Sequence, residues 1–266
     1  RLELDKPLLT QYGHFVNSLI HGNLGYSYIH GQPVTTVIKE AFPITLSLAL
    51  GAALIWLILG VLSGVLSAVR RGSILDRAVT TTALVFYSIP VFVLGLLMLY
   101  VFFYQLTIHG ARWFPGAGYT YISGNPFQWL RHLILPWISL ALISAATYTR
   151  LTRSTMLEVM GEDYIRTARA KGLVERRVIY RHSLRSALTP VISQFGIDVG
   201  TLLGGAILTE SVFSMPGLGY TVVNAISQQD LPVVIGITIV ATVAVVVANI
   251  LVDVAYAVLD PRVRLH

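Results

Sequence analysis

Long apolar runs without charged side chains dominate this chain of 266 residues. Residues 44–69 and residues 231–252 contain no charged residue, and each run is long enough to cross a bilayer, which takes roughly 20 residues. Only 12% of all residues are charged, against about 25% in soluble domains. So few charges cannot coat a water-soluble protein of this size. The sequence therefore predicts an integral membrane protein.

Five runs predict five transmembrane helices: residues 44–69, 78–108, 133–149, 187–209 and 231–252. None of them alternates between apolar and polar residues as the strands of a membrane barrel do. Helices satisfy every backbone hydrogen bond within the segment, so they are the expected spanning form. The predicted fold class is an all-α polytopic membrane protein. Pro90 is expected to kink the second helix, and Asp198 is the one charged residue of the fourth.

The basic residues set the expected orientation. Fourteen of the 19 lysines and arginines fall within three segments, residues 70–77, 150–185 and 262–264. Such an excess is typical of cytoplasmic loops, so the C-terminus is expected to be cytoplasmic. Five spans then place Arg1 outside, and we expect at least one further helix before it. Residues 1–43 are interpreted as an external segment, followed by a transmembrane domain over residues 44–266.

Residues 153–186, here called the basic loop, lie between the third and fourth predicted spans. Within them, residues 161–172 begin with acids, continue with bases and end on Gly172. A helix dipole favours that charge order, and glycine commonly ends a helix. A short helix is predicted, with Tyr164, Ala168 and Lys171 on one face. A solvated loop, or a loop on anionic lipid headgroups, explains the same residues equally well. Nucleic acid is not an expected partner, because aromatic stacking platforms are absent from the loop.

Several motifs in order carry a family resemblance. The basic loop contains Arg-Thr-Ala at residues 166–168, then Gly172, then His-Ser-Leu-Arg-Ser-Ala-Leu-Thr-Pro at residues 182–190. Thr-Glu-Ser-Val-Phe-Ser-Met-Pro-Gly-Leu-Gly follows at residues 209–219, and Asp-Leu-Pro-Val-Val at residues 230–234. Together they resemble the permeases of ABC importers in the dipeptide, oligopeptide and nickel branch. The chain is most similar to the first permease subunit of a dipeptide or oligopeptide transporter, with the type I importer fold.

The resemblance implies a non-catalytic subunit that forms half of a pathway for di- or oligopeptides across the bacterial cytoplasmic (inner) membrane. It implies three kinds of protein partner: a second homologous permease, two cytoplasmic ATPase subunits or a fused one, and an extracytoplasmic substrate-binding protein. ATP and magnesium would bind the ATPases, with no cofactor on this chain. No lysine here follows a glycine, so a phosphate-binding loop is absent from the sequence. The resemblance also implies a coupling helix in the basic loop, with contacts from Tyr164, Ile165, Arg166, Ala168, Arg169, Lys171, Gly172 and Leu173.

The fourth span and the loop after it contain candidates for the pathway and its gate. Gly196, Gly200 and Gly204 share one helical face, where small residues either pack within the chain or leave room at a permease–permease interface. Asp198 lies in a membrane segment, so it is expected to bind a substrate ammonium group or to pair with an arginine. Phe213 and Met215, in the external loop of residues 209–231, are candidates for a gate.

Other functions are compatible with parts of this pattern. Nickel and glutathione are alternative cargoes within the same branch. A proton-coupled secondary carrier that uses Asp198 belongs to a different class, but such carriers usually contain repeated halves, and no internal repeat is visible. The histidines form no metal-binding motif, so no metal site is predicted.

Overall fold

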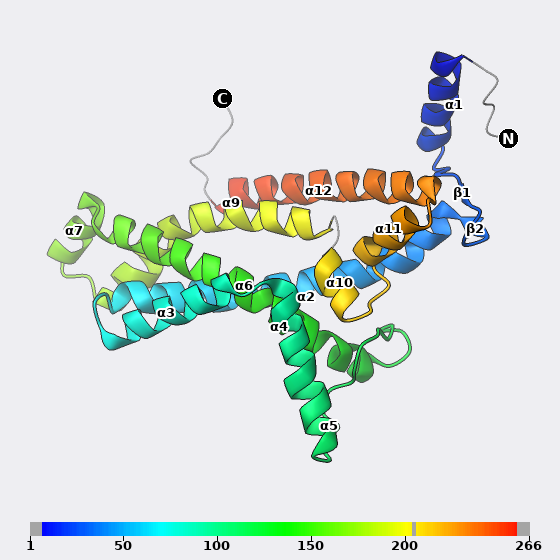
Figure 1. Cartoon of the computed structure of the whole chain (residues 1–266). Coiled ribbons are helices and arrows are strands. Elements are labelled where there is room, and N and C mark those ends of the chain that lie inside the picture. The colour runs from blue at the N-terminus through cyan, green and yellow to red at the C-terminus, as the bar shows by residue number, and fades with distance from the viewer. Residues whose placement is uncertain (1–6, 204–205, 260–266) are drawn as a thin grey trace.

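The computed structural model describes residues 7–203 and 206–259 as an almost entirely helical chain (Figure 1). This confirms the all-α prediction. The α-helices are α1 Leu8–Ile20, α2 Val34–Val69, α3 Ile74–Ser88, α4 Val91–Met98, α5 Leu106–Ile108, α6 Pro126–Met160, α7 Asp163–Ala170, α8 Glu175–Arg177, α9 Leu184–Leu203, α10 Ile207–Val212, α11 Leu218–Ser227 and α12 Leu231–Leu259. Two π-helical segments, η1 Leu99–Gln105 and η2 Val178–Ser183, join α4 to α5 and α8 to α9. An antiparallel pair of short strands, β1 Tyr26–Ser27 and β2 Gln32–Pro33, precedes α2.

The long helices α2, α6, α9 and α12 run along one another and form the body of the molecule (Figure 1). Glycines bring α2 and α6 into close contact. A Cβ atom on Gly60 would lie 2.3 Å from the Cβ of Tyr148, and one on Gly64 would lie 2.6 Å from the Cβ of Thr152. Small residues spaced by four allow helices in membranes to approach in this way. The pair therefore serves packing within the chain.

Within the described residues, four segments are long and apolar enough to cross a membrane: Val34–Val69, Val91–Ile108, Pro126–Met160 and Leu231–Leu251. They confirm a protein with several membrane-spanning helices. The fourth predicted span is not among them. It corresponds mainly to α9, in which Gln194 and Asp198 lower the mean hydropathy. The total of five spans thus stays a prediction.

The prediction of one kinked helix over residues 78–108 was wrong. Helix α3 ends at Ser88, Ile89 takes an extended conformation with φ −87° and ψ 125°, and α4 begins after Pro90. The proline ring disfavours helical geometry at the residue before it. The chain therefore breaks here, and α4, η1 and α5 turn away from α3 as a separate rod (Figure 1).

The first long helix also starts earlier than its charge-free run. Helix α2 begins at Val34, within the segment predicted to be external, and Pro43 lies inside it. Val34 and Ile38 are buried in a cluster with residues of α11 and α12. Lys39 and Glu40 are exposed, so these charges interrupt the apolar run without ending the helix.

The two loops of interest lie at opposite ends of the body. Helix α7 of the basic loop lies at one end and the strand pair at the other, while α11 and then α10 lie between the strand pair and the middle of the body (Figure 1). At that second end, Ser27 donates a hydrogen bond to Asp230, which fastens the strand pair to the start of α12. A structural change at one loop must therefore travel along the long helices to reach the other.

Candidate functional site

Helix α7 is the short helix that the sequence predicted in the basic loop. Asp163 lies in its first turn and Arg169 in its last, the arrangement that the helix dipole favours. Gly172 follows the helix end with a φ of +76°, a conformation that glycine adopts without steric cost. The predicted helix and its glycine end are both confirmed.

The inner face of α7 is covered by the chain itself. Ile165 is 0% exposed and Ala168 is 9% exposed. Both pack in a small cluster with Val178, and Leu173 is partly buried beside them. Three of the expected coupling residues thus hold α7 on the basic loop in this structure. Their direct contact with another protein stays a prediction.

The outer face of α7 is polar and accessible. The Tyr164 side chain is 47% exposed, and its hydroxyl donates to the Ser186 Oγ at 3.1 Å. Arg169 donates from Nη2 to Oε1 of Glu175 at 2.8 Å, which lowers the pKa of Glu175. Arg166 and Lys171 are exposed. This face presents one aromatic ring and several cations on a fixed helix.

Asp76 ties the start of α3 to the end of α6, a contact that the sequence analysis missed. Arg153 donates from Nε to Oδ1 of Asp76 at 2.8 Å and from Nη2 to Oδ2 at 3.0 Å, a bidentate pair. Ser67 and the N–H of Gly72 donate to the same carboxylate. These bonds, with that from Arg153 the strongest, hold the pKa of Asp76 well below 3.8. An acid three residues after the capping residue Ser73 indicates the start of a helix, but it does not indicate the pairing with Arg153.

Asp198 has hydrogen-bond donors on two helices. Tyr148 of α6 donates its hydroxyl to Oδ2 at 2.8 Å, and Gln194 donates from Nε2 to Oδ1 at 2.9 Å. The rings of Trp56 and Phe195 lie against Tyr148. A structural partner was one of the two expectations, and the observed partners are a tyrosine and a glutamine. These two donors take the place that the sequence analysis gave to an arginine, and contact of Asp198 with a substrate ammonium group stays a prediction.

The glycine stripe of α9 packs partly against α12. A Cβ atom on Gly200 would lie 3.4 Å from Oδ1 of Asn249 and 3.5 Å from Cγ1 of Val245. Gly196 is buried as well, while Gly204 lies outside the described residues. For Gly200 the structure therefore shows packing within the chain. A role of this stripe in a pathway stays a prediction.

Glu210 of α10 is a buried carboxylate that joins three helices, and its side chain is 0% exposed. Thr45 of α2 donates its hydroxyl to Oε1 at 2.7 Å, and the N–H of Tyr220 donates to Oε2 at 2.8 Å. The Thr45 oxygen in turn accepts the N–H of Leu218 at 2.8 Å. Leu218 and Tyr220 lie in the first turn of α11, so Glu210 and Thr45 supply acceptors for a helix N-terminus. Burial raises the pKa of Glu210, although these hydrogen bonds oppose the rise.

The two gate candidates follow Glu210 in a tightly constrained turn. Phe213 is 2% exposed and Met215 is 0% exposed. The N–H of Met215 donates to the Glu210 carbonyl at 2.8 Å, and Ser214 between the candidates has a φ of +49°, which is uncommon for a residue other than glycine. The turn is packed into the central core. Gating by Phe213 and Met215 stays a prediction.

Known proteins and a family model are similar in sequence to most of this chain. Residues 57–265 match the family model of the binding-protein-dependent transport system inner membrane component. The chain is 44% identical over 285 residues to the di/tripeptide transport system permease protein DppB of Pseudomonas aeruginosa (strain UCBPP-PA14), covering 99% of this chain and 83% of that protein. It is 43% identical over 281 residues to the dipeptide transport system permease protein DppB of Escherichia coli (strain K12), with the same coverage.

Two solved structures share the fold. One is the MetNI methionine ABC transporter in an inward-facing conformation, with a TM-score of 0.65, 20% identity, and 84% of this chain and 96% of that chain covered. The other is an amino acid ABC transporter with histidines, with a TM-score of 0.60, 15% identity, and coverages of 91% and 97%. The likeness establishes a shared fold.

Proposed function

This chain belongs to the family of binding-protein-dependent transport system inner membrane components, and on that premise we propose that it is a permease subunit of an ABC importer for dipeptides or tripeptides. The carrying observation is the match of 99% of the chain to peptide permeases at 39% to 44% identity. Nickel and glutathione are the alternative cargoes. A proton-coupled carrier that uses Asp198 is the alternative class, and family membership speaks against it.

The energy for transport comes from partner subunits. We place the contact with a cytoplasmic ATPase on the outer face of α7, where Tyr164, Arg166 and Lys171 are exposed. The buried inner face supports this assignment, because a helix that is packed on its own chain transmits a push as a rigid body. ATP and magnesium would bind the ATPases, and this chain would take no part in the chemistry of hydrolysis.

The basic loop is assigned to the cytoplasm, together with the C-terminus. Fourteen of the 19 basic residues support that orientation, since basic loops remain on the cytoplasmic side. The opposite end, with α11 and the strand pair (Figure 1), would then face a substrate-binding protein. A second, homologous permease would complete the pathway, and membrane lipid would surround both. The bacterial cytoplasmic membrane is the proposed location.

The proposed pathway includes two residues of α9, Asp198 and Gly196. Its proposed gate includes Phe213 and Met215. Asp198 is held by Tyr148, and the two gate candidates are buried in this conformation. They would reach cargo through movement of α9 and of the turn after α10. Among the residues that the structure describes, no cluster of histidine and acidic side chains has the form of a metal site.

The test is peptide uptake by the reconstituted complex, with the variant Gly172→Val. Gly172 has a φ of +76° and no atom within 4 Å of the position that a Cβ would take, and Gly110 is a matched control with a φ of +86° and equally open surroundings. Valine at either position strains the backbone by about 1–3 kcal/mol. We expect Gly172→Val to lower uptake per ATP hydrolysed, and Gly110→Val to leave that ratio unchanged. The same uptake per ATP hydrolysed in Gly172→Val and Gly110→Val would contradict the proposal, and so would peptide uptake in the absence of ATPase subunits.

A further inference from the structure

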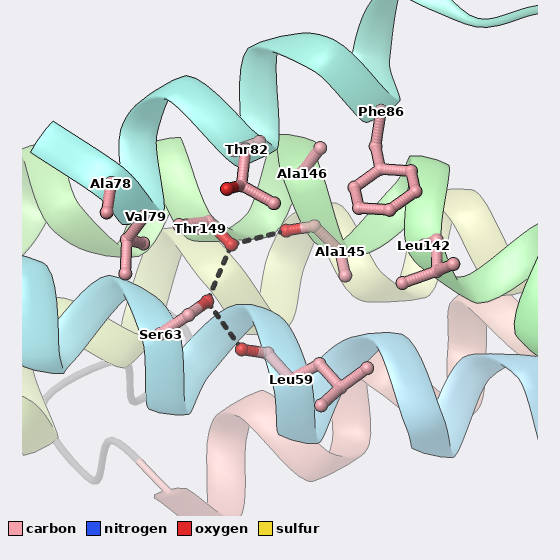
Figure 2. A pocket seen from close by; sticks show the side chains of 11 residues that line it. Leu59, Ser63, Ala78, Val79, Thr82, Phe86, Leu142, Ala145, Ala146 and Thr149 are labelled. Carbon is pink, nitrogen blue, oxygen red and sulfur yellow. Dashed lines mark hydrogen bonds between the residues drawn. The ribbon is translucent and has the colours of Figure 1, made fainter. Parts of the chain in front are cut away.

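A cavity of about 360 Å³ lies between α2, α3 and α6 (Figure 2). Small side chains are part of its lining, among them Ala78 and Ala83 on α3 and Ala145 and Ala146 on α6. Figure 2 shows Phe86 and Leu142 closing one end, and Ala78 and Val79 at the other. The complete lining is Leu59, Ser63, Ala78, Val79, Thr82, Ala83, Phe86, Leu142, Ala145, Ala146 and Thr149.

The lining suits a hydrocarbon rather than a peptide. None of these residues is charged, so none can pair with the ammonium or carboxylate group of a peptide. The hydroxyl oxygens of Ser63 and Thr149 lie 2.7 Å apart. The Ser63 hydroxyl donates to the carbonyl of Leu59 on its own helix, and the Thr149 hydroxyl donates to the carbonyl of Ala145 on its own helix. The hydroxyls of these two residues are satisfied within the protein, so the lining is apolar apart from the hydroxyl of Thr82.

One end of the cavity lies close to a group of exposed cations. Ala78 of the lining directly follows Arg77. Helix α2 ends at Val69, six residues after Ser63 and about 9 Å farther along the helix, and Arg70 and Arg71 follow that end. All three arginines are exposed. Within the described ranges none of the three has an acidic partner, whereas the nearby Arg153 is paired with Asp76.

We propose that this cavity binds one acyl chain of an anionic phospholipid from the cytoplasmic leaflet. The headgroup phosphate would lie among Arg70, Arg71 and Arg77, and the chain would extend past Thr82 toward Phe86. Leu59 and Ala78 at the rim are exposed, so a lipid can enter from the side. The leaflet follows from the orientation proposed above, while the pairing of an acyl chain with a phosphate follows from the charges alone.

The volume and the position support this occupant. The cavity volume of about 360 Å³ is at the lower end of the range of about 300–1,000 Å³ for small-molecule sites. This space suits one acyl chain but is too small for a helix of another protein. The occupant would fill the space between α3 and the α2–α6 pair. It would thereby brace the segment in which Asp76 anchors α3 to Arg153.

The test is phospholipid retention by the purified complex, measured by native mass spectrometry after detergent exchange. Thr82 is exposed and its side chain lies at the cavity (Figure 2), so Thr82→Trp fills the space with little risk to the fold. Thr81→Trp is the matched control, because Thr81 is exposed but does not line the cavity. We expect retained phosphatidylglycerol in the unmodified chain and in the control, and about tenfold less in Thr82→Trp. Arg77→Gln should retain lipid but lose the preference for phosphatidylglycerol over phosphatidylethanolamine.

Equal retention in the two tryptophan variants, or no retained lipid, overturns the site. An unchanged headgroup preference in Arg77→Gln overturns the role of the arginines. Lipid retention is measured without transport, so failure of the lipid site and failure of the proposed peptide import are separate results.

Discussion

Removal of the Glu210 carboxylate should loosen the start of α11. In Glu210→Ala, the Thr45 hydroxyl and the Tyr220 N–H both lose their acceptor. Glu210, Thr45 and Leu218 are at most 1% exposed, so water cannot easily replace the lost bonds. The Tyr220 N–H in the first turn of α11 and the Thr45 hydroxyl on α2 would then be unsatisfied donors, while the remaining helices keep their contacts.

The magnitude follows from the two lost bonds. A buried donor without a partner costs about 1–3 kcal/mol, so two of them cost roughly 2–6 kcal/mol. Glu210→Gln keeps the shape and one acceptor oxygen, and it should cost about half as much. At the lower limit of about 2 kcal/mol, local opening of α11 becomes roughly 30-fold more frequent.

Hydrogen–deuterium exchange of the complete complex measures this opening directly. The α11 amides should exchange roughly 30-fold faster in Glu210→Ala, less so in Glu210→Gln, and at the original rate in Glu158→Ala, an exposed glutamate of α6. Unchanged exchange in α11 after Glu210→Ala would refute the role of this carboxylate. An equal effect of the alanine and glutamine variants would refute the hydrogen-bond account.

Three further predictions concern packing and charge, and thermal unfolding of the complex measures all of them. Because the pKa of Asp76 is held below 3.8, its pairing stabilises the chain above about pH 4 and is lost on acidification; Asp76→Asn should lower Tm at pH 7, and the difference should shrink below about pH 4. Gly64→Ala places a Cβ 2.6 Å from that of Thr152 and should cost about 1–3 kcal/mol, whereas Gly13→Ala, with open space around it, should not lower Tm. Asp198→Asn gives up one acceptor and should cost about 1 kcal/mol; a much larger loss of peptide uptake would indicate contact with cargo, and unchanged uptake would exclude it.

The features that depend on neighbouring residues were predictable from the sequence. Hydrophobic burial depends on composition within a single run, so residues 44–69 and 231–252 do lie within α2 and α12. Helix α7 follows from its own charge order and from Gly172, which are local as well. Pro90 indicated a disturbance, but how far the chain turns there depends on what α4 packs against.

The features that depend on distant residues were not predictable. Thr45 and Glu210 are 165 positions apart, and Asp76 and Arg153 are 77 positions apart. Single-sequence patterns contain no signal for such pairs. The pattern of α7 does indicate an apolar face at Ile165, but periodicity cannot tell whether the cover comes from another protein or, as here, from Val178 of the same chain.

The packing of α7 on its own loop has a consequence for how a complex assembles. The eight residues of this helix are ordered before any other protein arrives, and ordering them during encounter would cost about 1–2 kcal/mol for each residue. A partner therefore meets a finished surface and needs only rigid docking. Such a contact can form and separate in every cycle of ATP hydrolysis without unfolding of the helix between cycles.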